Sequence, residues 1–198
     1  MPTPKPEIRD TDRPLSDDVR WLAACLGQSI RKFEGEECFR AVENLRVACR
    51  ARRRQEAGAA DLEALLERVD QLPIGVAAVV ARAFTHFFLL INTAEQVHRA
   101  RRRQARNAVA DAPPQPASSR WALQRLANRG MKAGEVAELL SRVEVRPVLT
   151  AHPTEATRRT VLSIQARIAD RLLKREHASP RRRVFYDRDL EAEVELLW

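Results

Sequence analysis

The sequence has few glycines, aromatic residues and cysteines, and each shortage counts against a class of protein. Six glycines in 198 residues, with 5% aromatic residues, argue against an all-β fold with many tight turns. Three cysteines, Cys25, Cys38 and Cys49, are an odd number without a CxxC pair. That pattern argues against a disulfide framework or a zinc site and favours a reducing compartment.

Long apolar runs are also missing. The N-terminal residues contain no apolar stretch of the kind that a secretory signal requires. The longest apolar run, residues 72–81, is too short to cross a bilayer and is followed at once by Arg82. These two absences predict a soluble protein of the cytoplasm without a membrane partner.

The residues that are abundant favour helices around a hydrophobic core. Hydrophobic residues make up 44% of the chain, and Ala, Leu, Arg and Glu are frequent. The net charge is +8, and arginine triplets stand at 52–54, 101–103 and 181–183. The triplets lie near predicted helix C-termini and lack interleaved aromatic residues. We therefore interpret them as solvated helix ends and expect no nucleic-acid partner.

The spacing of apolar residues predicts a mainly α-helical chain in four parts. These parts are a flexible tail (1–14), an N-terminal helical region (15–107), a Pro-rich linker or loop (108–119), and a last region of helices with one strand (120–198). In the last region, helices are expected over about 120–129, 132–140, 156–176 and 190–198.

Capping and breaking residues set the expected boundaries in the helical region. Ser16 is a suitable N-cap for the first helix, and Gly35 interrupts the pattern that follows. A third helix is expected from near Asp61, and Pro73 ends it or opens the next. That next helix, which runs to about Arg103, is the most apolar of the chain and needs partners on most of its surface.

One segment breaks the helical pattern. Residues 143–151 are rich in β-branched and apolar residues, and the first half alternates between apolar and charged side chains. The segment therefore predicts a strand, the only one in the chain. His152 follows this strand directly and precedes the helix expected from about Ala156.

The residues around His152 predict a site for an acidic substrate, either phosphorylated or carboxylated. The free N–H groups of the following helix favour anions, and Arg158 and Arg159 are expected one turn into that helix. Glu155 stands at a spacing from which it can orient a guanidinium, and Thr154 adds a hydroxyl. An imidazole exchanges protons near neutral pH. On the residues alone an alternative stays open, in which His152 caps the helix and the arginines form a solvated face.

The segment VLTAHPTEATRRT, residues 148–160, resembles the first active-site histidine motif of the phosphoenolpyruvate carboxylase family. ARAF at 81–84 with NTAEQVHR at 92–99 resembles the family's N-terminal helix, and Leu26-Gly27 with Gly35-Glu36 resembles its opening helices. ELLW at 195–198 resembles the start of the segment after the histidine motif. The resemblance covers about residues 15–198.

The resemblance implies a lyase that converts phosphoenolpyruvate and bicarbonate to oxaloacetate and phosphate, through carboxyphosphate and the enolate of pyruvate. This reaction fixes carbon for the tricarboxylic acid cycle and uses Mg²⁺ or Mn²⁺. His152 would be the catalytic residue that takes a proton from carboxyphosphate and stabilises it. Thr154, Glu155, Arg158 and Arg159 would support the substrate site. The family also implies a homotetramer and a (β/α)8 (TIM) barrel rich in extra helices, with residues 143–151 as its first strand.

The chain contains only a part of what that reaction needs. A barrel of this type takes roughly 250 residues and eight strands, and the family's metal-binding acids and catalytic lysine lie beyond the histidine motif. We therefore expect a truncated polypeptide with no metal ligands, inactive by itself, whose apolar helix is partly uncovered around residues 84–91. The alternative is a noncatalytic helical interaction module or a pseudoenzyme remnant of the same family.

Overall fold

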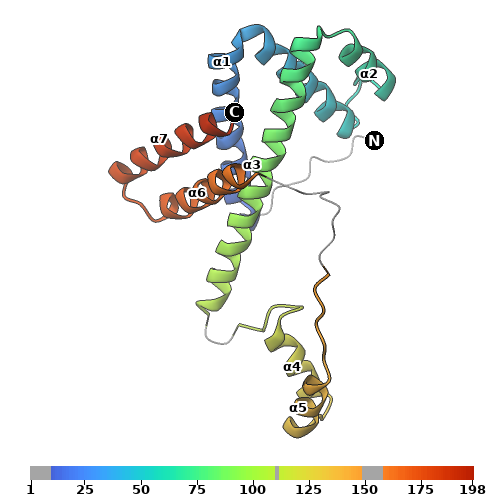
Figure 1. Cartoon of the computed structure of the whole chain (residues 1–198), viewed down its shortest axis with the longest axis vertical. Coiled ribbons are helices and arrows are strands. Elements are labelled where there is room, and N and C mark those ends of the chain that lie inside the picture. Colours follow the sequence, from blue (N-terminus) through green and yellow to red (C-terminus); the bar gives the residue numbers. More distant parts are fainter. Residues whose placement is uncertain (1–9, 110–111, 149–157) are drawn as a thin grey trace. The chain divides into compact units, whose positions relative to one another are not determined.

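The structure is a computed structural model, and it describes residues 10–109, 112–148 and 158–198. All regular structure in these three ranges is helical, which agrees with the predicted mainly α chain (Figure 1). The elements in order are η1 (Asp10–Asp12), α1 (Arg13–Arg53), α2 (Leu62–Asp70), α3 (Ile74–Asn107), α4 (Ser119–Asn128), α5 (Ala133–Ser141), α6 (Arg159–Glu176) and α7 (Pro180–Leu197).

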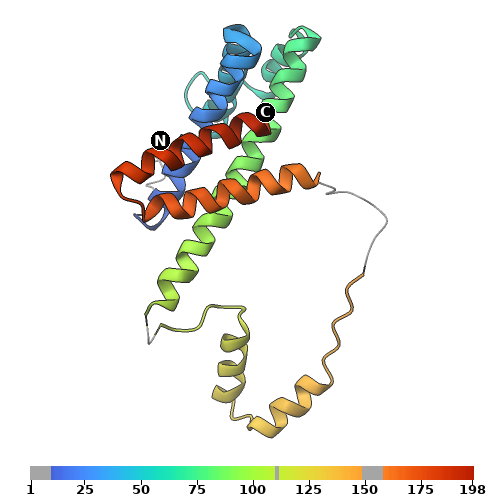
Figure 2. The same ribbon diagram turned by 60° about the vertical axis from the view of Figure 1, so that its left-hand side comes forward.

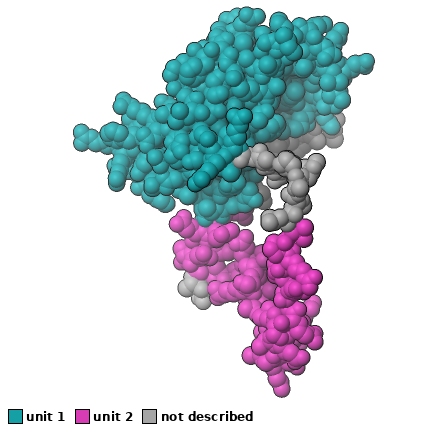
Figure 3. Space-filling model, viewed as in Figure 1, with its two compact units in different colours: residues 1–101, 157–198 teal, residues 102–156 magenta. Residues whose placement is uncertain are grey.

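The chain divides into two compact units (Figure 3). Unit 1 comprises residues 1–101 and 157–198, and unit 2 comprises residues 102–156. Unit 1 therefore contains α1, α2, most of α3, and the pair α6 and α7. Unit 2 contains the last turns of α3 together with α4 and α5.

The hydrophobic core lies in unit 1, where four helices meet. Figures 1 and 2 show α6 and α7 side by side, crossing α1 and α3. Their fully buried side chains come from all four helices and include Leu22, Leu90, Ile168, Leu190 and Val194. Burying each such side chain contributes on the order of 1.5–3 kcal/mol, so these contacts hold α6 firmly against the rest of the unit.

Unit 2 depends on local capping rather than on a core. Neither α4 nor α5 has a buried residue. The Ser118 hydroxyl accepts a hydrogen bond from the Trp121 amide at 3.2 Å and caps α4. The Glu135 carboxylate accepts one from the Lys132 amide at 2.7 Å at the start of α5. Each bond satisfies a backbone donor that a helix start leaves free.

Several predicted boundaries are confirmed by the structure. Gly35 kinks α1 with φ +87° and ψ 173°, a conformation open to glycine alone. Asp61 caps α2, since its carboxylate accepts from the Ala64 amide at 2.8 Å. Pro73 stands directly before α3. The sequence located these points because a cap, a kink and a missing N–H are local properties of single residues.

Two expected helix starts are wrong. Ser16 is not an N-cap, because α1 already begins at Arg13 after a turn of 3-10 helix, with a proline in its first turn. The last helix begins at Pro180, ten residues before the expected Leu190. In both cases a proline occupies the first turn, where its fixed φ favours the helix and its missing N–H costs nothing.

The position of the third arginine triplet is a correction that follows from the early start of α7. Arg181, Arg182 and Arg183 lie in the first turn of α7 rather than near a helix C-terminus. All three are exposed, and none makes an ion pair with another described residue. The helix dipole therefore does not stabilise them, contrary to the interpretation from sequence.

The predicted strand is wrong for the residues that the structure describes. Residues 143–148 form no strand, and Val145 and Val148 are 84% and 82% exposed. A strand needs a neighbour to pair its N–H and C=O groups and to cover its apolar side chains. No such neighbour exists in the described ranges. The remainder of the predicted strand, 149–151, lies outside them.

The apolar helix α3 is partly uncovered, as expected. Ile74 is 88% exposed and Phe88 is 59% exposed, whereas Leu90 and Ala94 are buried. An 18-residue window of α3 has a mean hydropathy of 2.0, long and apolar enough to cross a membrane by length and composition. This window is longer than the run considered in the sequence, but the core helix of a globular protein meets the same criterion.

Candidate functional site

The start of α6 carries the described part of the predicted site. Arg158 is the N-cap residue, with φ −57° and ψ 137°, and Arg159 is the first helical residue. Both side chains are exposed. His152, Thr154 and Glu155 lie outside the described residues. The arginines were expected one turn inside the helix, and this is wrong because the helix begins at Arg159.

The charges at this helix start oppose the stability of the helix itself. The first turn of α6 contains no acidic residue, and the N-cap side chain accepts no hydrogen bond from the backbone. A helix N-terminus carries partial positive charge, so two cations there are unfavourable. Such an end offers free N–H groups and guanidinium groups to an anion. The arrangement suits the binding of an acidic ligand better than it suits the folding of α6.

The rest of α6 is fixed against its neighbours, so its N-terminus has a defined position within unit 1. Ile164, Ile168 and Leu172 are buried on one face. The side-chain amide of Gln165 donates to the Leu89 carbonyl at 3.5 Å and to the Thr93 hydroxyl at 3.4 Å, which ties α6 to α3. This anchoring is what a site at a helix end requires.

A buried ionic cluster that the sequence analysis missed joins three helices of unit 1. Arg101 contacts Asp18 of α1 and reaches Glu176 of α6, with 2.6 Å between Nε and Oε2. The Nη2 group of the Arg101 guanidinium donates a hydrogen bond to the Leu172 carbonyl at 3.4 Å. Burial raises the pKa of Asp18 above its usual range, although Arg101 acts in the opposite direction. Helical spacing could have predicted that Arg101 faces the core, because it lies one turn after the buried Val97.

A second cluster gathers around Trp198, which had no assigned role. The Arg82 guanidinium lies 4.2 Å from the centre of the indole ring, and His86 meets that ring edge-on at 5.7 Å. The indole N–H donates to Glu34 at 3.2 Å. Burial, and then Arg82, lower the pKa of His86, so its ring favours the neutral form. His86 is half-buried at the rim of the core of unit 1.

The described residues offer no metal site, and the buried thiol of Cys25 is no nucleophile. Within residues 10–109, 112–148 and 158–198, no group of three or more His, Cys, Asp or Glu side chains could hold a metal ion. Burial raises the pKa of the Cys25 thiol to about 12, which keeps it protonated and unreactive. Neither kind of chemistry adds to the site at the start of α6.

Comparison with known proteins gives one consistent result. The sequence profile of the family described as phosphoenolpyruvate carboxylase matches residues 15–198. A phosphoenolpyruvate carboxylase of Nocardia farcinica is 40% identical over 191 residues, which is 96% of this chain and 20% of the relative. One of Nitrosomonas europaea is 39% identical over 194 residues, again 96% and 20%. One of Mycolicibacterium paratuberculosis is 39% identical over 186 residues, 94% and 19%. The chain thus spans about one fifth of the length of these relatives.

Proposed function

The chain belongs to the phosphoenolpyruvate carboxylase family, and from this premise we propose that it forms the part of such an enzyme that carries the catalytic residue His152. The enzyme would convert phosphoenolpyruvate and bicarbonate to oxaloacetate and phosphate. The observation that carries the proposal is the motif VLTAHPTEATRRT at residues 148–160, inside the matched range. Its two arginines stand at the start of α6 without an ion-pair partner among the described residues.

The charges at the start of α6 support the binding of an anionic substrate. Phosphoenolpyruvate carries a phosphate and a carboxylate, and carboxyphosphate carries the same two kinds of group. Arg158 and Arg159 offer planar donors that match either group, and the free N–H groups of α6 add to the positive field. Thr154 and Glu155 would complete the support of the substrate by a hydroxyl donor and by orienting a guanidinium.

His152 would act on the intermediate rather than on the first phosphoryl transfer. Phosphate moves from phosphoenolpyruvate to bicarbonate, which leaves carboxyphosphate and the enolate of pyruvate. The neutral imidazole of His152 takes the carboxyl proton of carboxyphosphate, which then separates into carbon dioxide and phosphate. The enolate carbon bonds to the carbon dioxide, and the product is oxaloacetate. An imidazole suits this step because its pKa lies near neutral pH.

The family also implies Mg²⁺ or Mn²⁺, which would neutralise negative charge on the phosphate groups. The described residues do not fit such an ion, because they offer no suitable group of ligands. We propose that its ligands belong to other parts of the longer family polypeptide. The same longer polypeptide would also supply a (β/α)8 barrel rich in extra helices. We further propose a homotetramer in the cytoplasm, and no oxaloacetate formation by these 198 residues alone.

A chimera tests the proposal directly. Residues 1–198 would replace the matching fifth of the Nocardia farcinica relative, and oxaloacetate formation would be followed by coupled reduction to malate. We expect the chimera to be active and His152→Asn to lower its kcat by at least about 100-fold, the usual contribution of a positioned acid or base. His177→Asn, at the exposed C-cap of α6, is the matched control and should leave kcat unchanged.

Two results would contradict the proposal. Unchanged carboxylation by the His152→Asn chimera would remove His152 from the mechanism. A chimera that assembles and melts like the parent enzyme, yet forms no oxaloacetate, would favour the pseudoenzyme or interaction module. Circular dichroism and gel filtration of every variant separate loss of chemistry from loss of folding.

A further inference from the structure

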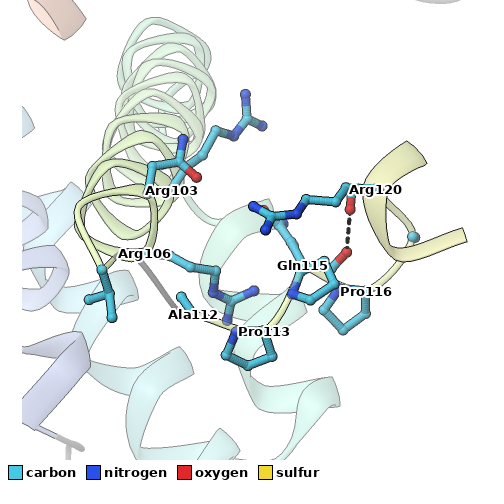
Figure 4. Close-up of a pocket in the computed structure, with 12 residues that line it drawn as sticks. Arg103, Arg106, Ala112, Pro113, Gln115, Pro116 and Arg120 are labelled. Atoms are coloured by element: carbon cyan, nitrogen blue, oxygen red, sulfur yellow. Dashed lines mark hydrogen bonds between the residues drawn. The ribbon is translucent and has the colours of Figure 1, made fainter. Parts of the chain in front are cut away.

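A hollow of about 540 Å³ lies within unit 2, between the last turns of α3 and the start of α4 (Figure 4). Arg103 and Arg106 extend from α3, and Arg120 extends from α4. Pro113 and Pro116 form part of the opposite wall. The volume falls in the range typical of sites for small organic ligands.

The described charged side chains that line this hollow all have the same sign. The described residues that line it include three arginines and no acidic residue. None of the three guanidinium groups makes an ion pair or a side-chain hydrogen bond with another described residue. By contrast, Arg101 and Arg175 of unit 1 each have a carboxylate partner. Three like charges around one space repel each other, and a bound anion would offset that repulsion.

Local hydrogen bonds fix the backbone conformation of the wall opposite α3. The Ser118 hydroxyl donates to the Gln115 carbonyl at 2.7 Å, and the Ser118 amide donates to the same oxygen at 3.1 Å. Since Ser118 also caps α4, the segment from Gln115 into α4 forms one continuous turn. Prolines fix their own φ angles and lose little entropy on binding a ligand. This segment of the lining therefore keeps its own conformation without a ligand.

We propose that this hollow binds a small organic dianion, either a phosphate monoester or a dicarboxylate. The guanidinium groups of Arg106 and Arg120 would hold the charged groups, and the proline rings would contact the carbon skeleton. The proposal is independent of carboxylation, because the hollow uses none of the residues of the motif at 148–160. Phenyl phosphate and glutarate are suitable probes for its two forms.

Isothermal titration of the 198-residue chain, at constant ionic strength, tests the proposal. We expect phenyl phosphate or glutarate to bind with a dissociation constant in the millimolar range or below. The double variant Arg106→Gln/Arg120→Gln should weaken that binding by at least about tenfold, because each lost charged hydrogen bond removes a substantial part of the affinity. The matched control is Arg129→Gln/Arg142→Gln, which removes the same charge from exposed positions of unit 2 outside the hollow. This control should retain the affinity.

Equal weakening in both double variants would overturn the proposal, because it would reveal attraction by net charge alone. Absence of binding by either probe, in a chain whose circular dichroism is native, would also overturn it. The proposal would also be overturned if an oligonucleotide bound more tightly than either probe and Arg106→Gln/Arg120→Gln left that binding unchanged. The positive charge of unit 2 would then serve nucleic-acid binding.

Discussion

The guanidinium of Arg101 in α3 donates a hydrogen bond to the carboxylate of Asp18 in α1, 83 residues away in sequence. Their side chains are 13% and 8% exposed, and Glu176 of α6 completes the cluster. The buried guanidinium of Arg101 in α3 therefore links α1 and α6 through its two carboxylate partners. Because an ion loses most of its hydration on burial, removing one partner leaves an uncompensated buried charge and lowers the free energy of unfolding.

Replacing Arg101 tests how much this cluster contributes to the free energy of unfolding. Arg101→Leu leaves the Asp18 carboxylate buried without its partner, so we expect the free energy of unfolding to fall by about 3–5 kcal/mol. The neighbouring Arg102 is exposed, and Arg102→Leu should change stability by less than about 0.5 kcal/mol. Urea denaturation followed by circular dichroism measures both. Similar losses in the two variants would contradict a special role for Arg101.

The pKa of Asp18 gives a prediction about pH. Burial raises the pKa of Asp18 above its usual range, so the folded chain holds this proton more tightly than the unfolded chain. The contribution of Asp18 to stability is then fully present below the unfolded pKa and is lost as pH rises through the folded pKa. Relative to Asp18→Asn, the wild-type chain should lose stability as pH rises from about 4. A wild-type advantage that grows over this range would show the opposite shift.

Gly35 gives a prediction about backbone strain. Its φ of +87° and ψ of 173° are accessible to glycine and strongly unfavourable for other residues, although a Cβ there would meet no atom within 4 Å. Gly35→Ala should therefore destabilise unit 1 by about 1–3 kcal/mol through strain alone. Gly75→Ala, in the first turn of α3 with equally open space, should be neutral or stabilising by up to about 1 kcal/mol. Thermal melts of the two variants compare them directly, and equal melting temperatures would remove the strain argument.

The arginines at the start of α6 should oppose stability while serving binding. Arg159→Gln removes a cation from the positive end of the helix, so we expect a gain of about 0.3–1 kcal/mol in low salt. The gain should shrink in 1 M salt, because exposed charges are screened. In the active chimera the same change should raise KM for phosphoenolpyruvate. A stability loss together with an unchanged KM would assign Arg159 to folding instead.

The sequence by itself determined the helical class of the chain and the positions of its local breaks. Caps such as Asp61, the kink at Gly35 and the proline before α3 depend on one residue and its immediate neighbours. The motif around His152 was equally readable, because it is a continuous run of residues. These features were predictable since they need no contact from a distant part of the chain.

Only the tertiary structure decided which charges are buried and which face solvent. Arg101, Arg102 and Arg103 are adjacent in sequence, yet Arg101 is paired inside unit 1 and Arg103 faces a hollow in unit 2. The side chains of residues 143–151 predict a strand. A strand also needs a neighbouring backbone to pair with, and the described chain supplies none for residues 143–148. Pairing and burial are properties of two or more segments together, so a pattern within one segment does not determine them.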